Sequence, residues 1–351
     1  MRWGIIGWGT RTGIGTINWS FWRTGRFATW LMPAHPERIP LAAAPDDPGI
    51  VQTDLRDERA LAQWLSQIDA LFFTERPFFD DAIPIFLKAK RRGLLIACEP
   101  VAEWIPPSHT AWLHLPDVMW APTRHTFPVL RTAAQQVPRS HYPFPWTNHI
   151  VGGRWGIELA RWPFKLRTVC RRFLFCNGGG GCLGRKGLAV VLEAARRAPE
   201  CSVLIRSQVP IPRTAPANVE LRVGNDPDQA GLYSEGDVLL APSLFEGYGY
   251  SLYEAQACGM PVIATNFPPM DEAGAAWPLA CSGGLSHSLC GRPFEYAQPS
   301  AVALAAIMRA VNGRSIEAES RAAFERSRAW EIGDVVADLQ RYTEALLPPA
   351  L

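Results

Sequence analysis

The chain of 351 residues contains no run of about eighteen apolar residues, so no segment is long enough to span a bilayer. Its start, Met1-Arg2-Trp3, leads directly into an apolar stretch and lacks the separate charged and apolar regions of a signal peptide. The eight cysteines show no Cys-x-x-Cys spacing, and the seven histidines form no spaced cluster. We therefore expect a cytoplasmic protein with reduced thiols, no transmembrane segment and no protein-bound metal.

An excess of charge of one sign is also missing. The 35 Lys and Arg residues against 33 Asp and Glu residues leave a net charge of +2, which argues against a strong general field for nucleic acid. One basic and aromatic run, residues 161–172, is the local exception. It favours a solvated linker, and its alternative is a contact with phosphate or the surface of a membrane.

The length fits two domains, and the segment pattern predicts an α/β class for both. Strand-like apolar runs alternate with helix-like segments, which is typical of parallel, doubly wound sheets. Pro-rich sequence from Val137 to about Trp162 predicts a linker, and residues 315–347 predict a helical tail. The expected strands are 3–7, 69–74, 94–98 and 118–121 in the first half, and 173–176, 202–206, 219–223, 238–241 and 262–264 in the second.

The most informative segment is 236–265. A short apolar strand, 238–241, stops at Pro242-Ser243, and the turn Glu246-Gly247-Tyr248-Gly249 follows. A helix that begins near Tyr250 carries Glu254 and ends at Gly259 before the next strand. The turn therefore lies at the carboxyl end of a strand in a βαβ unit, which is where open α/β sheets bind ligands.

A second motif precedes the first. The apolar strand 173–176 is followed by Asn177 and the glycines at 178–181, by Arg185-Lys186-Gly187 and by a helix. A strand, a glycine-rich loop, a basic pair and a helix start together form a cradle that suits phosphate.

The two motifs together resemble the donor-sugar site of the retaining GT-B glycosyltransferases, most closely glycosyltransferase family 4. The family pattern is a strand that ends in Pro-Ser, Glu-Gly-(aromatic)-Gly, a second Glu after seven intervening residues, and Cys-Gly-x-Pro-Val-Ile. The matching positions are Pro242, Ser243, Glu246, Gly247, Tyr248, Gly249, Glu254, Gly259, Pro261 and Val262.

The resemblance implies a role for each motif residue. Glu246 would bind the hydroxyls of the donor sugar, with Ser243 beside it, and Glu254 would bind the ribose hydroxyls of the nucleotide. The amides of 247–249 would meet the diphosphate or the sugar, and Lys186 would bind the diphosphate. Family members usually carry an earlier Arg as well, and this chain has glycine at Gly178 to Gly181 instead. Either backbone amides or Arg185 would then replace that guanidinium.

In the first half, the resemblance places a glycine turn at Gly13 and Gly15 opposite the donor phosphate, although a purely structural turn is an equal alternative. Many family members also carry a His at the end of a strand here, where this chain has Glu99 and Glu103. We expect Glu103 to contact a hydroxyl of the acceptor or the donor, with Glu99 and His125 as lesser candidates and a loop-capping role for Glu103 as the alternative.

The resemblance implies a GT-B fold: domain 1–155 on the acceptor side, donor domain 165–330, and a helix at 331–351 that returns to the first domain. It implies transfer of a hexose from a UDP- or GDP-sugar with retention of configuration, with Glu246, Lys186 and Glu103 as catalytic candidates and no tightly bound cofactor. A glucosyltransferase for a hydroxylated nucleobase in DNA, or a nucleotide-sugar-binding module without turnover, remains an alternative. The sequence leaves the acceptor open among a saccharide, a lipid-linked or small-molecule glycan and a modified nucleic acid, and it leaves the oligomeric state open.

Overall fold

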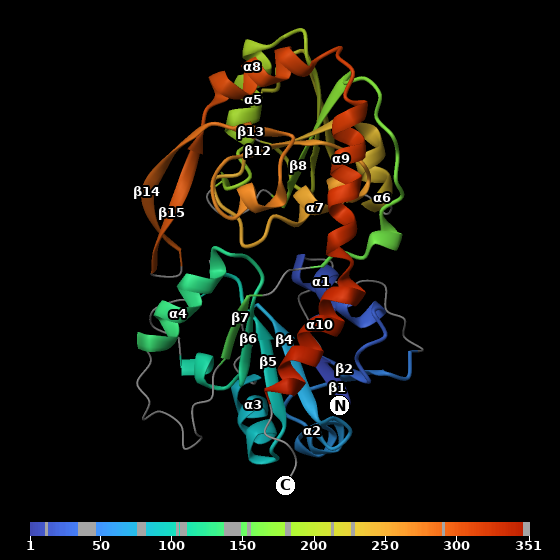
Figure 1. Ribbon diagram of the computed structural model, residues 1–351, viewed down its shortest axis with the longest axis vertical. Helices are drawn as coiled ribbons and strands as arrows, with labels where there is room; N and C mark the ends of the chain where they lie inside the picture. The colour runs from blue at the N-terminus through green and yellow to red at the C-terminus, as the bar shows by residue number, and fades with distance from the viewer. Residues whose placement is uncertain are drawn as a thin grey trace. The chain divides into compact units, whose positions relative to one another are not determined.

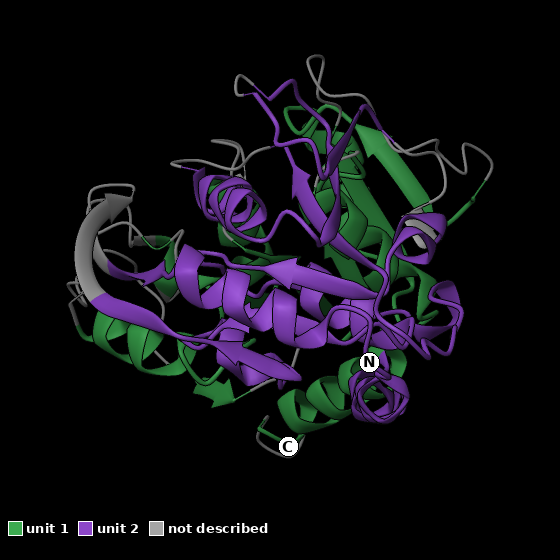
Figure 2. Ribbon diagram, turned by 90° about the horizontal axis from the view of Figure 1, so that it is seen from above, with its two compact units in different colours: residues 1–156, 289–292, 332–351 green, residues 157–288, 293–331 purple. Residues whose placement is uncertain are grey.

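The computed structural model describes residues 1–10, 13–33, 47–75, 82–102, 105, 111–136, 149–152, 156–179, 184–211, 214–225, 229–289 and 292–346. The chain divides into two compact units, coloured separately in Figure 2. Unit 1 comprises Met1–Gly156, Leu289–Arg292 and Ile332–Leu351, and unit 2 comprises Ile157–Ser288 and Pro293–Glu331.

Unit 1 is built on a seven-stranded parallel sheet with the order β3-β2-β1-β4-β5-β6-β7. The strand order reverses between β1 and β4, so the crevice at their carboxyl ends is the topological switch point of this sheet. The strands are β1 (Trp3–Ile6), β2 (Thr29–Pro33), β3 (Ile50–Thr53), β4 (Ala70–Thr74), β5 (Leu95–Glu99), β6 (Val118–Ala121) and β7 (His149–Gly152).

Helices cover this sheet, which explains why its central strands are buried throughout and mostly apolar (Figure 1). They are α1 (Gly13–Arg23), α2 (Glu58–Leu65), α3 (Ala82–Arg91), η2 (Ala111–His114), α4 (Thr126–Gln136) and α10 (Ile332–Ala345). The last of them, α10, runs beside α1 although more than three hundred residues separate them in sequence.

Tryptophans form much of the core of unit 1, and their indole N–H groups have partners. Trp30 Nε1 donates to the Gly7 carbonyl at 2.9 Å. Trp120 Nε1 donates to Thr343 Oγ1 at 3.0 Å, and Trp3 Nε1 donates to Glu344 Oε1 at 2.8 Å. A buried indole that lacked an acceptor would lose its hydrogen bond to water without replacement. Helix α10 thus completes the polar pairing of two tryptophans on β1 and β6.

Unit 2 contains a six-stranded parallel sheet with the order β10-β9-β8-β11-β12-β13 and a separate two-stranded hairpin, β14-β15. Here the strand order reverses between β8 and β11. The strands are β8 (Arg172–Gly178), β9 (Ser202–Ser207), β10 (Val219–Val223), β11 (Val238–Ala241), β12 (Val262–Thr265), β13 (Trp277–Leu279), β14 (Cys281–Leu289) and β15 (Arg292–Pro299).

Short and long helices connect these strands. The α-helices are α5 (Leu188–Arg197), α6 (Gln229–Leu232), α7 (Tyr250–Ala257), α8 (Ala301–Val311) and α9 (Glu317–Ser327). The 3₁₀ turns are η4 (Leu159–Arg161), η6 (Tyr233–Glu235), η7 (Met270–Ala273) and η8 (Arg328–Trp330). The expectation of two parallel α/β sheets is confirmed.

Of three expectations about individual segments, two were wrong. The linker predicted for 137–162 contains β7, which pairs with β6 in the first sheet. The helical tail predicted for residues 315–347 is confirmed: it consists of α9, η8 and α10, and η8 and α10 fall in different units. The run 161–172 is no solvated linker, because Trp162 and Arg167 are buried.

Candidate functional site

The two motifs of the second half follow neighbouring strands. β8 and β11 pair in parallel, Leu174 opposite Leu239, so the loops after them leave the same edge of the sheet at its switch point. The two loops are joined directly, because the amide of Leu244 donates to the carbonyl of Arg185 at 2.7 Å. The structure therefore brings the basic pair and the Glu246 turn together.

Glu246 is the centre of this cluster. Its side chain is buried, and Oε1 accepts hydrogen bonds from Lys186 Nζ at 2.6 Å and from Ser243 Oγ at 2.8 Å. Ser243 is itself held by Thr265 on β12, whose hydroxyl donates to the Ser243 carbonyl at 2.8 Å. Two residues that the sequence nominated, Lys186 and Ser243, thus fix the orientation of a third.

The charge state of Glu246 follows from these contacts. Burial alone would raise the pKa of its carboxyl group, but the charges of Lys186 and Arg185 and the hydrogen bonds from Lys186 and Ser243 outweigh burial. The pKa of Glu246 is lowered as a result. The site therefore holds an ionised carboxylate that can accept hydrogen bonds from hydroxyl groups.

Arg185 lies at the same carboxylate. Its Nη2 is 4.0 Å from Glu246 Oε2, and its guanidinium carbon lies 5.6 Å from the centre of the Phe245 ring. Both Arg185 and Lys186 retain partial exposure, at 21% and 22% of the side chain. Two cations are thus available to an anion at the strand edge where the sequence lacks the earlier Arg.

The turn after Glu246 is closely packed. Gly247, Tyr248 and Gly249 are buried, and Gly249 has a φ of +84° immediately before α7. The Tyr248 ring stacks on Tyr253 of α7, with ring centres 4.2 Å apart and planes 6° apart. The tyrosine of the motif therefore holds the turn against its own helix.

Glu254 lies in the middle of α7 and is half-buried. Its Oε2 accepts a hydrogen bond from the Tyr233 hydroxyl at 2.6 Å. Burial raises the pKa of Glu254, while the bond from Tyr233 and the charges of Arg161 and Lys186 lower it in part. The charge of Lys186 therefore favours the ionised form of both carboxylates of the motif.

Sequence reasoning missed Tyr233 and Arg161. Tyr233 stands in the 3₁₀ turn η6 before β11, and Arg161 in the 3₁₀ turn η4. Both residues are distant from Glu254 in sequence. The folded chain brings the Tyr233 hydroxyl into a hydrogen bond with Glu254 and the charge of Arg161 near enough to lower its pKa. Tyr233 lies a few residues before β11, and no local sequence pattern indicates that it meets Glu254.

In unit 1, the glycine turn expected at Gly13 and Gly15 was wrong, because both residues belong to the first turn of α1. Gly15 is buried, and a methyl group there would lie 1.9 Å from the Thr10 carbonyl oxygen. Packing thus requires this glycine, whereas Gly13 is exposed at the helix start with open space around it. A role toward phosphate stays a prediction for both.

Glu103 lies outside the described residues. Glu99 ends β5 with a fully buried side chain, and its carbonyl accepts the amide of Glu75 at 2.8 Å. Glu75 has a φ of +58°, an unusual backbone conformation for a residue other than glycine. His125 is half-buried between β6 and α4.

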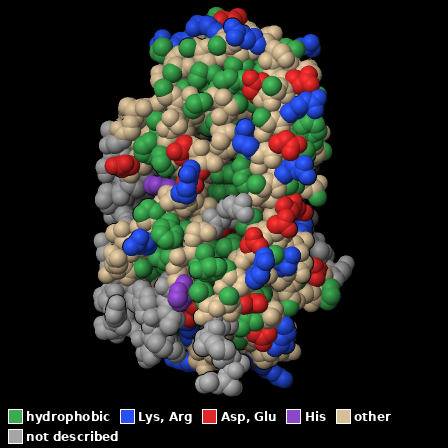
Figure 3. Space-filling model, in the orientation of Figure 1, with side chains coloured by type: hydrophobic (Ala, Val, Ile, Leu, Met, Phe, Trp, Pro, Cys, Tyr) green, Lys and Arg blue, Asp and Glu red, His purple; other side chains and the backbone are tan. Residues whose placement is uncertain are grey.

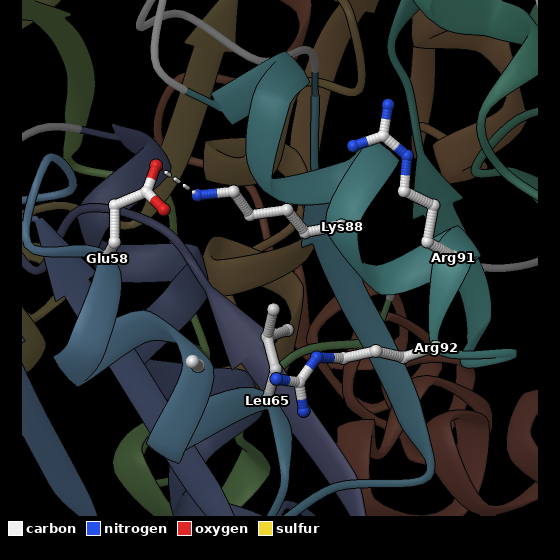
Figure 4. Close-up of a pocket in the computed structure, with 6 residues that line it drawn as sticks. Glu58, Leu65, Lys88, Arg91 and Arg92 are labelled. Carbon is white, nitrogen blue, oxygen red and sulfur yellow. Dashed lines mark hydrogen bonds and ion pairs between the residues drawn. The ribbon is translucent and has the colours of Figure 1, made fainter.

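A separate pocket lies in unit 1 between α2 and α3 (Figure 4). Its volume is about 270 Å³, and its lining combines the apolar Ala62 and Leu65 with charged side chains. Lys88 Nζ pairs with Glu58 Oε1 at 2.8 Å. None of the residues nominated from the sequence lines it.

Basic side chains also gather over α5 and α8, at the top of Figure 3. They are paired: Arg197 Nε lies 2.8 Å from Glu193, and Arg309 Nε lies 2.9 Å from Glu200. Exposed pairs of this kind contribute little and do not indicate a ligand site.

Among the residues that the structure describes, no group of three or more His, Cys, Asp and Glu side chains is arranged to hold a metal ion. The described cysteines, Cys98, Cys170, Cys176, Cys201, Cys258 and Cys281, are free thiols. In the described part of the chain, no helix combines the length and apolarity needed to cross a membrane.

A family model matches the region that contains the cluster around Glu246. A family model described as "Glycosyl transferases group 1" matches residues 184–279. The D-inositol 3-phosphate glycosyltransferase of Arthrobacter sp. (strain FB24) is 43% identical over 49 residues, which span 14% of this chain and 12% of that protein.

Solved structures resemble the chain over most of its length. Anabaena HepE, solved with UDP and glucose, has a TM-score of 0.64 at 11% identity and covers 99% of this chain and 100% of its own. A glycosyltransferase from Rickettsia africae has a TM-score of 0.62 at 13% identity and covers 99% and 100%. The pneumococcal O-GlcNAc transferase GtfA, solved with UDP and GlcNAc, has a TM-score of 0.53 at 15% identity and covers 82% and 59%.

These identities are low, so the structural likeness bears on the fold. The two parallel-sheet α/β units and their similarity to these enzymes show that the chain has the fold of the GT-B glycosyltransferases.

Proposed function

We propose that this protein is a glycosyltransferase that moves a hexose from a nucleotide-sugar donor to an acceptor hydroxyl. The observation that carries the proposal is the cluster of Lys186, Ser243 and Glu246 at the carboxyl ends of β8 and β11. It combines a cation for a diphosphate with an ionised carboxylate for sugar hydroxyls, at the edge where such sheets bind nucleotides.

Each residue has a distinct task in this proposal. Lys186 and Arg185 bind the diphosphate and stabilise the negative charge that builds on it as the glycosidic bond breaks. Glu246 accepts hydrogen bonds from the sugar hydroxyls, and Glu254 from the ribose. Arg185 replaces the earlier Arg that this chain lacks. The distance of 4.0 Å from its Nη2 to Glu246 Oε2 supports this role, because it places the guanidinium at the same cluster.

The finer features rest on the motif resemblance. We propose retention of the anomeric configuration, with the acceptor hydroxyl attacking on the face that the diphosphate leaves. This route needs no separate general base. HepE and GtfA were both solved with UDP, which makes UDP-glucose and UDP-GlcNAc the first donors to test.

The proposal is tested with the full chain and a panel of UDP- and GDP-hexoses. Calorimetry measures nucleotide binding, and release of the nucleoside diphosphate measures hydrolysis or transfer. We expect binding and slow donor hydrolysis for at least one sugar, and loss of both in Glu246→Gln. Binding without hydrolysis, and without transfer to acceptors in a glycan, lipid and DNA panel, would instead identify a nucleotide-sugar-binding module. Absence of binding by every donor would overturn the proposal.

A further inference from the structure

The hydroxyl of Tyr233 and the carboxylate of Glu254 form a hydrogen bond of 2.6 Å inside unit 2. Tyr233 is 2% exposed and stands in η6, immediately before β11, whereas Glu254 stands in α7, which follows β11. We propose that Tyr233 is a positioning residue for nucleotide recognition: it holds Glu254 Oε2 so that Oε1 faces the ribose hydroxyls. This inference rests on the proposed function, because it concerns the nucleotide of the donor.

Tyr233 is suited to this task because both its ring and its backbone are fixed. Trp162 packs edge-on against its ring, with ring centres 5.4 Å apart and planes at 76°. The buried guanidinium of Arg167 donates to the carbonyl of Tyr233 and to the carbonyl of Cys258, at the end of α7. One arginine thus ties the segment of Tyr233 to the helix of Glu254, and the phenol cannot drift from the carboxylate.

A fixed carboxylate binds a diol better than a mobile one. A free glutamate side chain must lose rotamer freedom when it accepts a hydrogen bond. Tyr233 has already ordered Glu254, so that loss occurs on folding and does not weaken nucleotide binding. Since a carboxylate oxygen has two acceptor sites, the bond from Tyr233 also leaves acceptor capacity for hydroxyls.

The phenol is a donor here and not a base. Burial and the neighbouring Glu254 raise the pKa of Tyr233 well above its ordinary value. Tyr233 therefore stays protonated throughout the physiological range of pH and donates a hydrogen bond to the carboxylate. The hydrogen bond stabilises the ionised form of Glu254. Unlike a salt bridge, it brings no opposite charge, so the carboxylate keeps its net negative charge.

Several other groups face Glu254. Arg161 of η4 and Lys186 of the loop before α5 favour its ionised form, and Lys186 also pairs with Glu246. The thiols of Cys176 on β8 and Cys258 after α7 stay neutral, because burial raises the pKa of each to about 12. Burial raises the pKa of Glu254 itself. The ionisation of Glu254 therefore depends more strongly on the hydrogen bond from Tyr233 than the ionisation of an exposed carboxylate would.

The test replaces Tyr233 with Phe, which removes only the hydroxyl. Calorimetry gives the affinity of the full chain for UDP, 2′-deoxy-UDP and 3′-deoxy-UDP between pH 5 and 8. We expect the wild-type preference for the ribonucleotide to fall by about tenfold in Tyr233→Phe, which corresponds to one hydrogen bond to a charged group. Affinity for UDP should also begin to fall at a higher pH than in the wild type, because Glu254 protonates sooner without its donor.

Two controls isolate the mechanism. Tyr342→Phe removes a hydroxyl from an exposed tyrosine in unit 1 and should change neither the preference nor the pH profile. In the background of Glu254→Gln, Tyr233→Phe should change the ribose preference less than twofold, since its effect passes through the carboxylate. If Tyr233→Phe does not fold, 3-fluorotyrosine at position 233 preserves the packing and has a more acidic phenol, which should shift the pH profile downward.

An unchanged ribose preference and pH profile in Tyr233→Phe would overturn the inference while UDP binding by the wild type upheld the proposed function. An equal loss of affinity for UDP and both deoxy analogues would show a merely structural role and would also overturn it. An unmoved pH profile with 3-fluorotyrosine would have the same meaning. A wild-type protein that binds no nucleotide would instead defeat the proposed function itself.

Discussion

Gly187 and Pro242 approach so closely that a methyl group on residue 187 would lie 2.0 Å from the Pro242 carbonyl oxygen. Gly187 also has a φ of +79° and stands at the start of α5. The contact joins the loop that carries Lys186 to the loop that carries Glu246. Only a residue without a side chain lets the two loops meet at this distance, so this glycine determines how far apart the cation and the carboxylate lie.

Replacing Gly187 with Ala should therefore destabilise the protein by about 2–5 kcal/mol, the sum of a left-handed backbone cost and a steric clash with backbone atoms. Urea unfolding monitored by tryptophan fluorescence measures the change. Gly313→Ala is the matched control, because Gly313 has a φ of +76° and nothing within 4 Å of the added methyl. Its cost should be only about 1–2 kcal/mol. Equal costs for the two variants would contradict the close approach.

Lys186→Ala should lower the rate of sugar transfer by roughly a hundredfold or more, because it removes a fixed cation from the departing diphosphate. Lys88→Ala is a matched control: Lys88 also pairs with a glutamate, at 2.8 Å, but on α3 of unit 1. Steady-state rates with a saturating donor measure the effect. Near-normal turnover in Lys186→Ala would mean that backbone amides and Arg185 suffice to hold the diphosphate.

Glu254→Gln should weaken binding of the nucleoside diphosphate by about 1.5–3 kcal/mol, since a charged acceptor for the ribose becomes neutral. Calorimetry at pH 8 measures this loss. Glu325→Gln changes an exposed glutamate on α9 and should leave affinity unchanged. Unaltered binding in Glu254→Gln would show that another group recognises the ribose.

The pairing of Lys186 with Glu246 predicts a dependence of stability on pH. The folded-state pKa of Glu246 is lowered from 4.5, so its ionised form stabilises the fold above that value. This contribution is lost as the pH falls through the lowered folded-state pKa. Lys186→Gln should therefore destabilise the protein at pH 7 and much less at the acidic end, where Glu246 is protonated in both proteins. A difference in unfolding free energy that is independent of pH would contradict the ion pair.

Glu103 stays a prediction drawn from the sequence. Glu103→Ala should slow transfer to an acceptor while UDP affinity stays within about twofold, because its proposed contact is to a hydroxyl and not to the nucleotide. Transfer rates and calorimetry on one preparation separate the two effects. The buried Glu99, at the end of the same strand region, has no exposed surface to offer a substrate. Full transfer activity in Glu103→Ala would reject the assignment.

The cluster of Lys186, Ser243 and Glu246 could be predicted from the sequence because it depends on local order. β8 and β11 are short, mostly buried runs, each followed by a loop that contains glycine, and these loops carry the three side chains. Parallel pairing then brings the two loops to one edge. Lys186, Ser243 and Glu246 needed only this arrangement to meet.

Other parts could not be predicted, because long-range packing decides them. β7 is an edge strand with a half-exposed pattern and follows Pro-rich sequence, so no apolar run marks it. Glycine has low helix propensity, yet Gly13 and Gly15 lie in the first turn of α1, where Gly15 leaves room for the backbone of Thr10. Tyr233 meets Glu254 across β11, a partnership that no local pattern indicates.

The attachment of α10 to unit 1 has a consequence for how the chain folds during synthesis. A ribosome delivers β1 and β6 early, but the acceptors for the Trp3 and Trp120 indoles are on Glu344 and Thr343, near the end of the chain. The helix that contains them belongs to unit 1, whereas unit 2 is encoded almost entirely between the two parts. The larger part of unit 1 is therefore synthesised before unit 2, and its Trp3 and Trp120 indoles gain their acceptors only after α10 has followed unit 2.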